Sequence, residues 1–158
     1  SSTSRGLGDV YKRQFRYCKS SADNDTKGTY KMAIEINHEF AATPEALWDI
    51  LGTPDRVDWV PGVESCSFDG EVRSLVLPGA GAIKERILKH DDESRTLEYA
   101  CFESPGGLES HRARVQVTAS ETGCKLVWQT SVMPESIEPF IKGSMQGCIA
   151  RLETILRS

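Results

Sequence analysis

The amino-acid sequence predicts an α+β fold. The expected architecture is a seven-stranded antiparallel sheet, with two short helices after the first strand and a long C-terminal helix over the sheet. Three observations predict it. Segments with alternating apolar residues recur between residues 33 and 133. Short turn signals such as Asp69-Gly70 separate them, and such turns join antiparallel neighbours. The C-terminal segment instead repeats apolar residues at spacings of three and four.

The first strand is expected at 33–41, where Ile34, Ile36, His38 and Phe40 alternate. Thr43-Pro44 is a helix-start signal, because Thr caps a helix and Pro suits its first position. It predicts a short helix over 44–52, and Thr53-Pro54 predicts a second over 54–59. The remaining strands are expected at 63–68, 71–77, 81–90, 95–103, 108–119 and 124–133. The long helix is expected at about 136–157, where Gly143 and Gly147 either leave room for a ligand or pack against a strand.

The chain has 158 residues, of which 39% are hydrophobic and 27% charged, as expected for one globular domain over 32–158. No apolar run approaches the roughly 18 residues that span a bilayer. The first 30 residues hold six of the 19 basic and three of the 23 acidic side chains, so the rest carries 13 and 20, a net charge of −7. An acidic domain of this kind is not expected to bind nucleic acid.

Residues 1–31 are expected to be a disordered leader that is not part of the native protein. They show no sustained periodicity and are rich in Ser, Gly, Asp and Lys. Met32 stands immediately before the first patterned segment, which suggests a natural start there. Deleting the leader is therefore expected to leave the melting temperature unchanged.

The cysteines and histidines indicate neither disulfides nor a metal site. The five cysteines are scattered, and the three histidines lie far apart in the sequence. A CxxC pair is absent, and no spacing matches that of zinc ligands. We therefore expect reduced thiols, a cytoplasmic location, and neither a metal nor a cofactor.

Glu85 occupies an unusual position. In an extended strand it shares a face with Ile83 and Ile87, and a buried carboxylate without a partner is costly. Either this face is exposed, or Glu85 has a partner and a function.

Several stretches resemble the START-like, or SRPBCC, superfamily, which has the helix-grip fold. They are ATPEALWDIL, DWVPGV, GEVRSLVLPGAGAIKERIL, DDESRTLEY and KLVWQTSVMP, within residues 33–157. The resemblance implies a curved sheet gripping the long helix around a deep cavity. In plant hormone receptors of the superfamily a Glu points into that cavity beside an Arg of the preceding strand. The positions that match here are Glu85 and Arg73.

Strand alternation then predicts the residues that face such a cavity. The wall is mostly apolar and aromatic with a few polar groups, as small-molecule pockets usually are. The expected ligand-binding residues are Trp59, Arg73, Ile83, Glu85, Ile87, Leu97, Tyr99, Cys101, His111, Trp128, Thr130 and Met145.

Each polar candidate has a structural alternative. Glu85 either contacts the ligand or forms a structural ion pair with Arg73. Arg73 either holds an oxygen of the ligand or lies on the surface. His111 is either an acid or base near neutral pH or a core histidine bonded to the backbone. Cys101 lacks an evident activating base, which favours an inert buried thiol.

Three functions remain open from the sequence, of which the third and weakest is a role in binding a protein partner. The first is binding of a small hydrophobic molecule, as a carrier or sensor of lipid-like compounds. The second is a polyketide cyclase, dehydratase or isomerase activity, with Glu85 as general base and Arg73 as oxyanion stabiliser. The absence of a nucleophile–base pair, phosphate loop or metal cluster from the sequence pattern favours binding or simple proton transfer.

Overall fold

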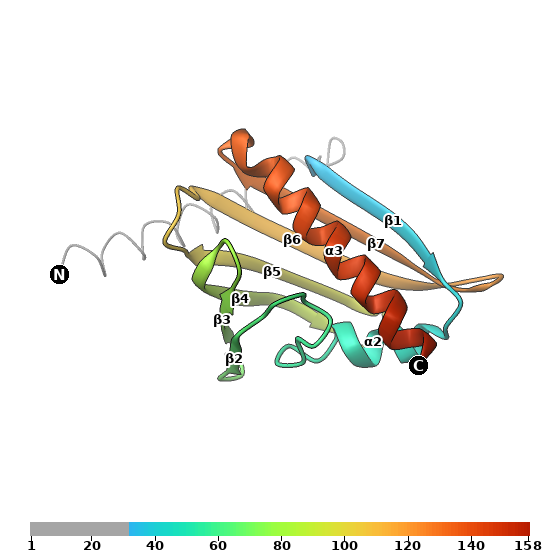
Figure 1. Cartoon of the computed structure of the whole chain (residues 1–158). Helices are drawn as coiled ribbons and strands as arrows, with labels where there is room; N and C mark the ends of the chain where they lie inside the picture. Colours follow the sequence, from blue (N-terminus) through green and yellow to red (C-terminus); the bar gives the residue numbers. More distant parts are fainter. Residues whose placement is uncertain (1–31) are drawn as a thin grey trace, which may run out of the picture.

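The computed structural model describes residues 32–158, so the predicted leader 1–31 lies outside the described residues. Within them, seven strands form one antiparallel sheet in the order β1-β7-β6-β5-β4-β3-β2. Figure 1 shows the long helix α3 (Glu138–Arg157) across one face of this curved sheet, with the short helix α2 (Pro44–Leu51) on the same side. The predicted α+β helix-grip architecture is confirmed.

The predicted strands match the observed ones, with ends that differ by at most two residues. The strands are β1 (Ile34–Phe40), β2 (Ser65–Phe68), β3 (Val72–Leu77), β4 (Gly81–Asp91), β5 (Thr96–Glu103), β6 (Ser110–Ser120) and β7 (Gly123–Met133). A short 3₁₀ turn, η1 (Glu135–Ile137), leads from β7 into α3. The strands β4, β6 and β7 are the longest, with 11 residues each.

The second predicted helix, at 54–59, is wrong. Helix α2 begins as expected, with the Thr43 hydroxyl accepting a hydrogen bond from the Ala46 amide at 3.1 Å. The segment after it instead forms separate turns. Side chains take the carbonyls that a helix needs: Arg73 donates to Pro54 O, and Trp59 donates to Arg56 O. These bonds tie the segment to the site described below.

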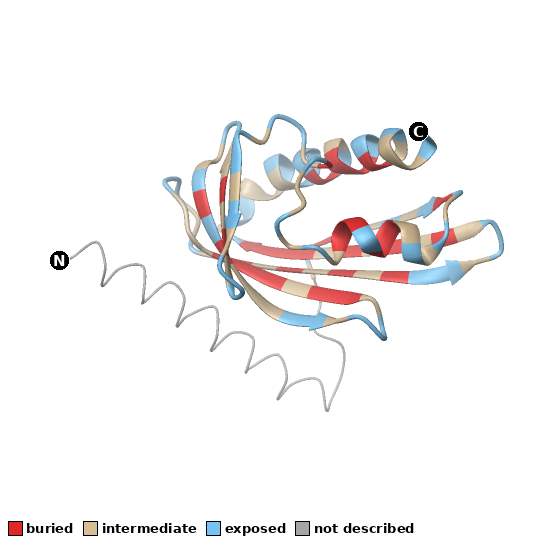
Figure 2. Ribbon diagram, turned by 90° about the horizontal axis from the view of Figure 1, so that it is seen from below, coloured by how far each residue is buried: buried red, intermediate tan, exposed pale blue. Residues whose placement is uncertain are grey.

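The main hydrophobic core lies between the sheet, α2 and the C-terminal half of α3. Leu47, Leu126 and Leu152 are fully buried there and come from α2, β7 and α3. In Figure 2 buried residues alternate with less buried ones along the strands and also occur in α2 and α3. A second, smaller cluster of Leu75, Ile83 and Cys101 lies on β3, β4 and β5. Between this cluster and the first half of α3 the interior is not filled by side chains.

The two glycines of α3 do not make room for a ligand, which corrects that expectation. A methyl group on Gly143 would meet nothing within 4 Å, and one on Gly147 would lie 3.7 Å from Pro61. Gly143 is exposed, so its lack of a side chain serves no contact among the described residues.

Gly143→Ala is therefore expected to stabilise the fold by about 1 kcal/mol, since glycine weakens a helix interior by that amount relative to alanine. Urea unfolding of both proteins measures the difference. Gly79→Ala is the matched control and should destabilise instead. Gly79 has φ +79°, and an added methyl group would lie 3.1 Å from the Phe140 ring. A loss of stability in Gly143→Ala would contradict the prediction.

Candidate functional site

A cavity of about 660 Å³ lies between the concave face of the sheet and the first half of α3. Most of the predicted ligand-binding residues line it. They are Trp59, Arg73, Ile83, Glu85, Tyr99, Cys101, His111, Trp128, Thr130 and Met145. The structure thus brings together side chains from β3, β4, β5, β6, β7, α3 and the turn after α2. Their contact with a ligand stays a prediction.

Ile87 and Leu97 do not line the cavity, which corrects the predicted set. Leu97 is buried in the main core, and Ile87 packs against that core. Both follow the predicted alternation but lie farther along β4 and β5, where α2 covers the sheet and side chains fill the space. Alternation predicts which face a side chain is on, but not where along a strand the interior opens.

The rim of the cavity is formed by the β3–β4 turn at Pro78–Ala80, the β5–β6 loop at Ser104–Leu108 and the start of α3. The superfamily resemblance points to the first two, because 77–82 and 106–111 match the segments at the cavity mouth of the hormone receptors. Only the start of α3 was missed from the sequence. Phe140 stands there 51% exposed, with Gly79 packed against its ring. The signal that points to Phe140 is that it falls outside the apolar series of Ile141, Met145 and Cys148, which recur at spacings of four and three on the same helix.

Arg73 and Glu85 form a buried ion pair at the centre of the site. They face each other in the register of β3 and β4, and they are 4% and 7% exposed. Arg73 Nε and Nη2 donate to the same carboxylate oxygen, Glu85 Oε1, at 2.9 and 2.7 Å. This answers the question that Glu85 raised, because an inward carboxylate beside isoleucines is matched by a cation on the neighbouring strand.

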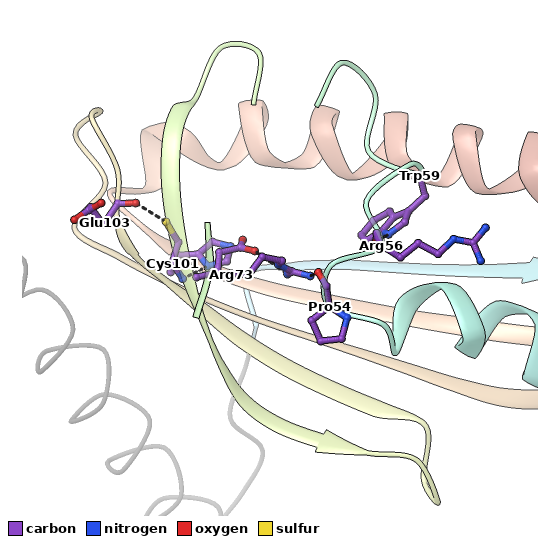
Figure 3. Close-up of polar contacts among 8 residues, drawn as sticks. Pro54, Arg56, Trp59, Arg73, Cys101 and Glu103 are labelled. Atoms are coloured by element: carbon purple, nitrogen blue, oxygen red, sulfur yellow. Dashed lines mark hydrogen bonds and ion pairs between the residues drawn. The ribbon is translucent and has the colours of Figure 1, made fainter. Parts of the chain in front are cut away.

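Further contacts fix the Arg73 guanidinium. Its Nη1 donates to Pro54 O at 3.0 Å, and Figure 3 shows the side chain reaching from β3 to the turn that carries Pro54. The guanidinium carbon lies 5.1 Å from the centre of the Tyr99 ring. Burial opposes the charge of Arg73, but the carboxylate of Glu85 outweighs it and the pKa of Arg73 is raised. Arg73 therefore stays charged, and all three of its nitrogens are engaged.

His111 is a buried, neutral imidazole whose tautomer follows from its partner. Its Nδ1 accepts a hydrogen bond from the backbone amide of Cys101 at 3.1 Å. A backbone amide can only donate, so Nδ1 carries the lone pair and the proton sits on Nε2. Burial lowers the pKa of His111, while nearby Glu85 partly opposes that shift. The backbone pairing of β5 with β6 ends at Tyr99 and Ala113. Just beyond that point, the His111 ring accepts the hydrogen bond from the Cys101 amide.

Aromatic side chains that carry one polar atom, such as Tyr99 and Trp128, form another part of the cavity wall. Tyr99 lies 5.9 Å from His111 between ring centres, and Trp59 packs edge-on against Trp128 at 5.8 Å. Burial, together with the Glu85 charge, raises the pKa of Tyr99, so its phenol stays protonated. The Trp128 indole lowers that pKa to a lesser extent, although its buried Nε1 completes no hydrogen bond of good geometry within the described residues.

The thiols and the remaining polar groups of the wall are not arranged for nucleophilic chemistry. Burial raises the pKa of Cys101 to about 12 and that of Cys148 to about 12. The reactive thiolate is therefore scarce at neutral pH. Thr130 Oγ1 lies 3.5 Å from Met145 Sδ, which turns that hydroxyl toward α3. The wall offers binding and, through Glu85 and His111, proton acceptance or donation.

Two general features of residues 32–158 bear on partners. No helix in this part of the chain combines the length and the apolar character needed to cross a bilayer. The same residues contain no group of three or more His, Cys, Asp or Glu side chains placed to hold a metal ion.

Comparison with known proteins agrees with this geometry. The family model described as polyketide cyclase / dehydrase and lipid transport matches residues 31–157. No curated protein matches the chain. Similar solved structures include XoxI from Bacillus cereus, 23% identical with a TM-score of 0.72, covering 79% of this chain and 95% of that one. An uncharacterised protein from Bacillus thuringiensis is 21% identical with a TM-score of 0.71 over 79% and 98%.

The protein Ara h 8.0201 has a similar structure as well, with 16% identity and a TM-score of 0.65 over 78% of this chain and 95% of that one. At these identities the likeness to solved structures shows the fold alone. The family match, in contrast, spans nearly all of the described residues.

Proposed function

Because the chain belongs to the polyketide cyclase / dehydrase and lipid transport family, we propose that it binds a small, mostly apolar molecule in its internal cavity, as a carrier or sensor. One observation carries the proposal: a cavity of about 660 Å³ between sheet and helix, walled mainly by apolar and aromatic side chains around one buried ion pair. Sites for small organic ligands usually have this size and composition.

The rim supports entry of such a molecule from outside. Phe140 and the turn at Pro78–Ala80 border the cavity, and a half-exposed aromatic ring beside a glycine turn can move without disturbing the core. A cytoplasmic location belongs to the same proposal. It is supported by the thiols of Cys66, Cys101, Cys124 and Cys148.

The geometry gives less support to the enzymatic alternative. A cyclase, dehydratase or isomerase would use Arg73 to stabilise an oxyanion, but its three nitrogens already donate to Glu85 and Pro54. Two of its five N–H groups take no part in these bonds, but the Glu85 charge offsets the positive charge that would stabilise the oxyanion, so strong stabilisation would require the ion pair to separate. Binding requires no such rearrangement.

Native mass spectrometry of protein purified from cells tests the proposed binding. We expect a co-purified small molecule that is lost in Ser144→Trp, since Ser144 lines the cavity and a large ring there occupies it. Gln146→Trp is the matched control, because Gln146 is exposed on the same helix and does not line the cavity. It should retain the molecule.

A second assay covers the case in which the natural molecule dissociates during purification. The uncharged dye Nile red should bind the unmodified protein and Gln146→Trp with equal affinity, and Ser144→Trp weakly. Absence of both a co-purified molecule and dye binding would overturn the proposed function.

A further inference from the structure

The polar groups of the cavity restrict which molecules it can bind. This inference rests on the proposed function, the binding of a small molecule in the cavity. Arg73 is the only cation among the cavity-lining residues, and Glu85 is the only carboxylate. Both side chains are buried, and Nη2 of one lies 2.7 Å from Oε1 of the other. Their charges therefore cancel within the cavity.

An anionic ligand gains little from this arrangement. Arg73 Nε and Nη2 donate to Glu85, and Nη1 donates to Pro54 O. Two of the five Arg73 N–H groups take no part in these bonds, but a ligand carboxylate that met them would lie beside the Glu85 carboxylate. Like charges at such a separation repel strongly where little water screens them. The ion pair thus selects against acids rather than attracting them.

Glu85 nevertheless has an acceptor to offer. Both Arg73 bonds go to Oε1, and within the described residues Oε2 has no hydrogen-bond partner. The Oε2 atom is not fully enclosed by protein atoms and keeps some accessible surface. Because Glu85 lines the cavity, a ligand there can reach this oxygen. A ligand that expels water from this carboxylate oxygen without donating a hydrogen bond to it loses affinity.

His111 offers the complementary donor. Nδ1 is occupied by the Cys101 amide, which leaves the proton on Nε2. Within the described part of the chain Nε2 has no hydrogen-bond partner. Like Glu85 Oε2, it keeps some accessible surface. His111 also lines the cavity. The imidazole can therefore donate to an oxygen of the ligand.

The two groups lie within reach of one small molecule. Arg73 Cζ is 5.1 Å from the Tyr99 ring centre and the His111 ring centre is 5.9 Å from it, so the guanidinium and imidazole are at most about 11 Å apart. Glu85 is in direct contact with Arg73. Most of the other residues that line the cavity are apolar or aromatic, as at Ile83 and Trp128.

We propose that the cavity selects an uncharged, oxygenated apolar molecule. One hydroxyl of the ligand donates to Glu85 Oε2, and a separate carbonyl or ether oxygen accepts from His111 Nε2. Carboxylic acids of the same shape are disfavoured because the Arg73 charge is already neutralised.

Four probes on one carbon skeleton test this selectivity by calorimetry or Nile red displacement. The probes are 4-(hydroxymethyl)benzophenone, 4-methylbenzophenone without the hydroxyl donor, 4-benzylbenzyl alcohol without the carbonyl, and 4-benzoylbenzoic acid with a carboxylate. We expect the first to bind about tenfold more tightly than each of the others, since each loses one polar contact or adds a repulsion.

Glu85→Gln sharpens the test because it leaves the Arg73 charge uncompensated. We expect the preference to reverse: the acid should bind more tightly to this variant than to the unmodified protein, and the hydroxymethyl probe about tenfold less tightly. Glu71→Gln is the matched control, since Glu71 is an exposed carboxylate paired with Arg86 outside the cavity. His111→Phe should weaken binding of the carbonyl probes but not of 4-benzylbenzyl alcohol.

The outcomes separate this inference from the proposed function. If Nile red and 4-methylbenzophenone both fail to bind, the cavity does not take apolar molecules and the proposed function fails with the inference. If both bind but the acid binds the unmodified protein as tightly as the hydroxymethyl probe does, only the inferred selectivity is overturned. The probe series needs no variant, so it remains decisive if Glu85→Gln does not fold.

Discussion

Arg73→Ala is expected to lower the free energy of unfolding by about 3–5 kcal/mol, the cost of removing one member of a buried ion pair. The variant leaves the Glu85 carboxylate at 7% exposure without its cation. It also leaves Pro54 O without the donor that ties the turn after α2 to β3. Both losses act on the folded state alone.

Urea unfolding measures the effect, and Arg56→Ala is the matched control. Arg56 pairs with Asp58 at 3.0 Å in a surface position, where the two side chains are 39% and 50% exposed. Exposed pairs contribute roughly 0–1 kcal/mol, so this variant should be nearly as stable as the unmodified protein. Equal small losses in both variants would show that Arg73 and Glu85 are hydrated or apart.

The double variant Arg73→Met/Glu85→Leu separates the ion pair from the packing. Apolar residues of similar volume often replace a buried pair at little cost, because no charge is left without a partner. We therefore expect it to be more stable than Arg73→Ala. The same double variant should lose the selectivity for hydroxyl-bearing probes while still binding Nile red, since its cavity remains but lacks the carboxylate.

Most of the fold could be predicted from the sequence because the signals that specify it are local. Alternation places Ile83 and Glu85 on one face, and turn residues such as Asp69-Gly70 set the antiparallel order. The helix expected at 54–59 fails for a reason that is partly non-local. Its carbonyls are taken by Arg73 and by the Trp59 ring nitrogen, and Arg73 comes from a strand that follows later in the chain.

The site was predictable in its residues but not in its bonding. Alternation and the resemblance both point to Glu85, whereas Arg73 follows mainly from the resemblance. The register of β3 and β4 puts the two residues opposite each other. No sequence pattern indicates that both Arg73 donors would choose one carboxylate oxygen, or that His111 would accept from the Cys101 amide. The His111 bond depends on where the pairing of β5 and β6 ends, and the proposed ligand selectivity rests on both details.

The protein is expected to lose stability below about pH 6.5 because of His111, whose pKa is lowered from 6.5 by burial. The sign follows from proton binding: between the lowered pKa and 6.5 the unfolded chain binds a proton at this residue that the folded protein does not. The stability that the neutral imidazole contributes is thus fully present above 6.5 and is lost as the pH falls toward the folded pKa. Within that window the loss is about 1.4 kcal/mol per pH unit.

The groups around His111 set the size of this effect. The Glu85 carboxylate favours the imidazolium and the Arg73 guanidinium opposes it, so the balanced ion pair leaves burial as the main cause. Protonation would also place a hydrogen on Nδ1, where the Cys101 amide already donates, and would break that bond. Acid therefore disturbs the junction of β5 and β6 at the cavity wall.

His111→Gln is the variant that isolates this titration. A glutamine amide oxygen can still accept from the Cys101 amide but does not titrate. Urea unfolding between about pH 5 and 8 should give a steeper fall in acid for the unmodified protein than for His111→Gln, with the two curves parallel above about pH 7. His38→Gln is the control, because His38 pairs with Glu153 in a half-exposed position away from the cavity. Parallel curves for the unmodified protein and His111→Gln at every pH would show that the imidazole is hydrated in the folded protein, which contradicts its burial in the cavity wall.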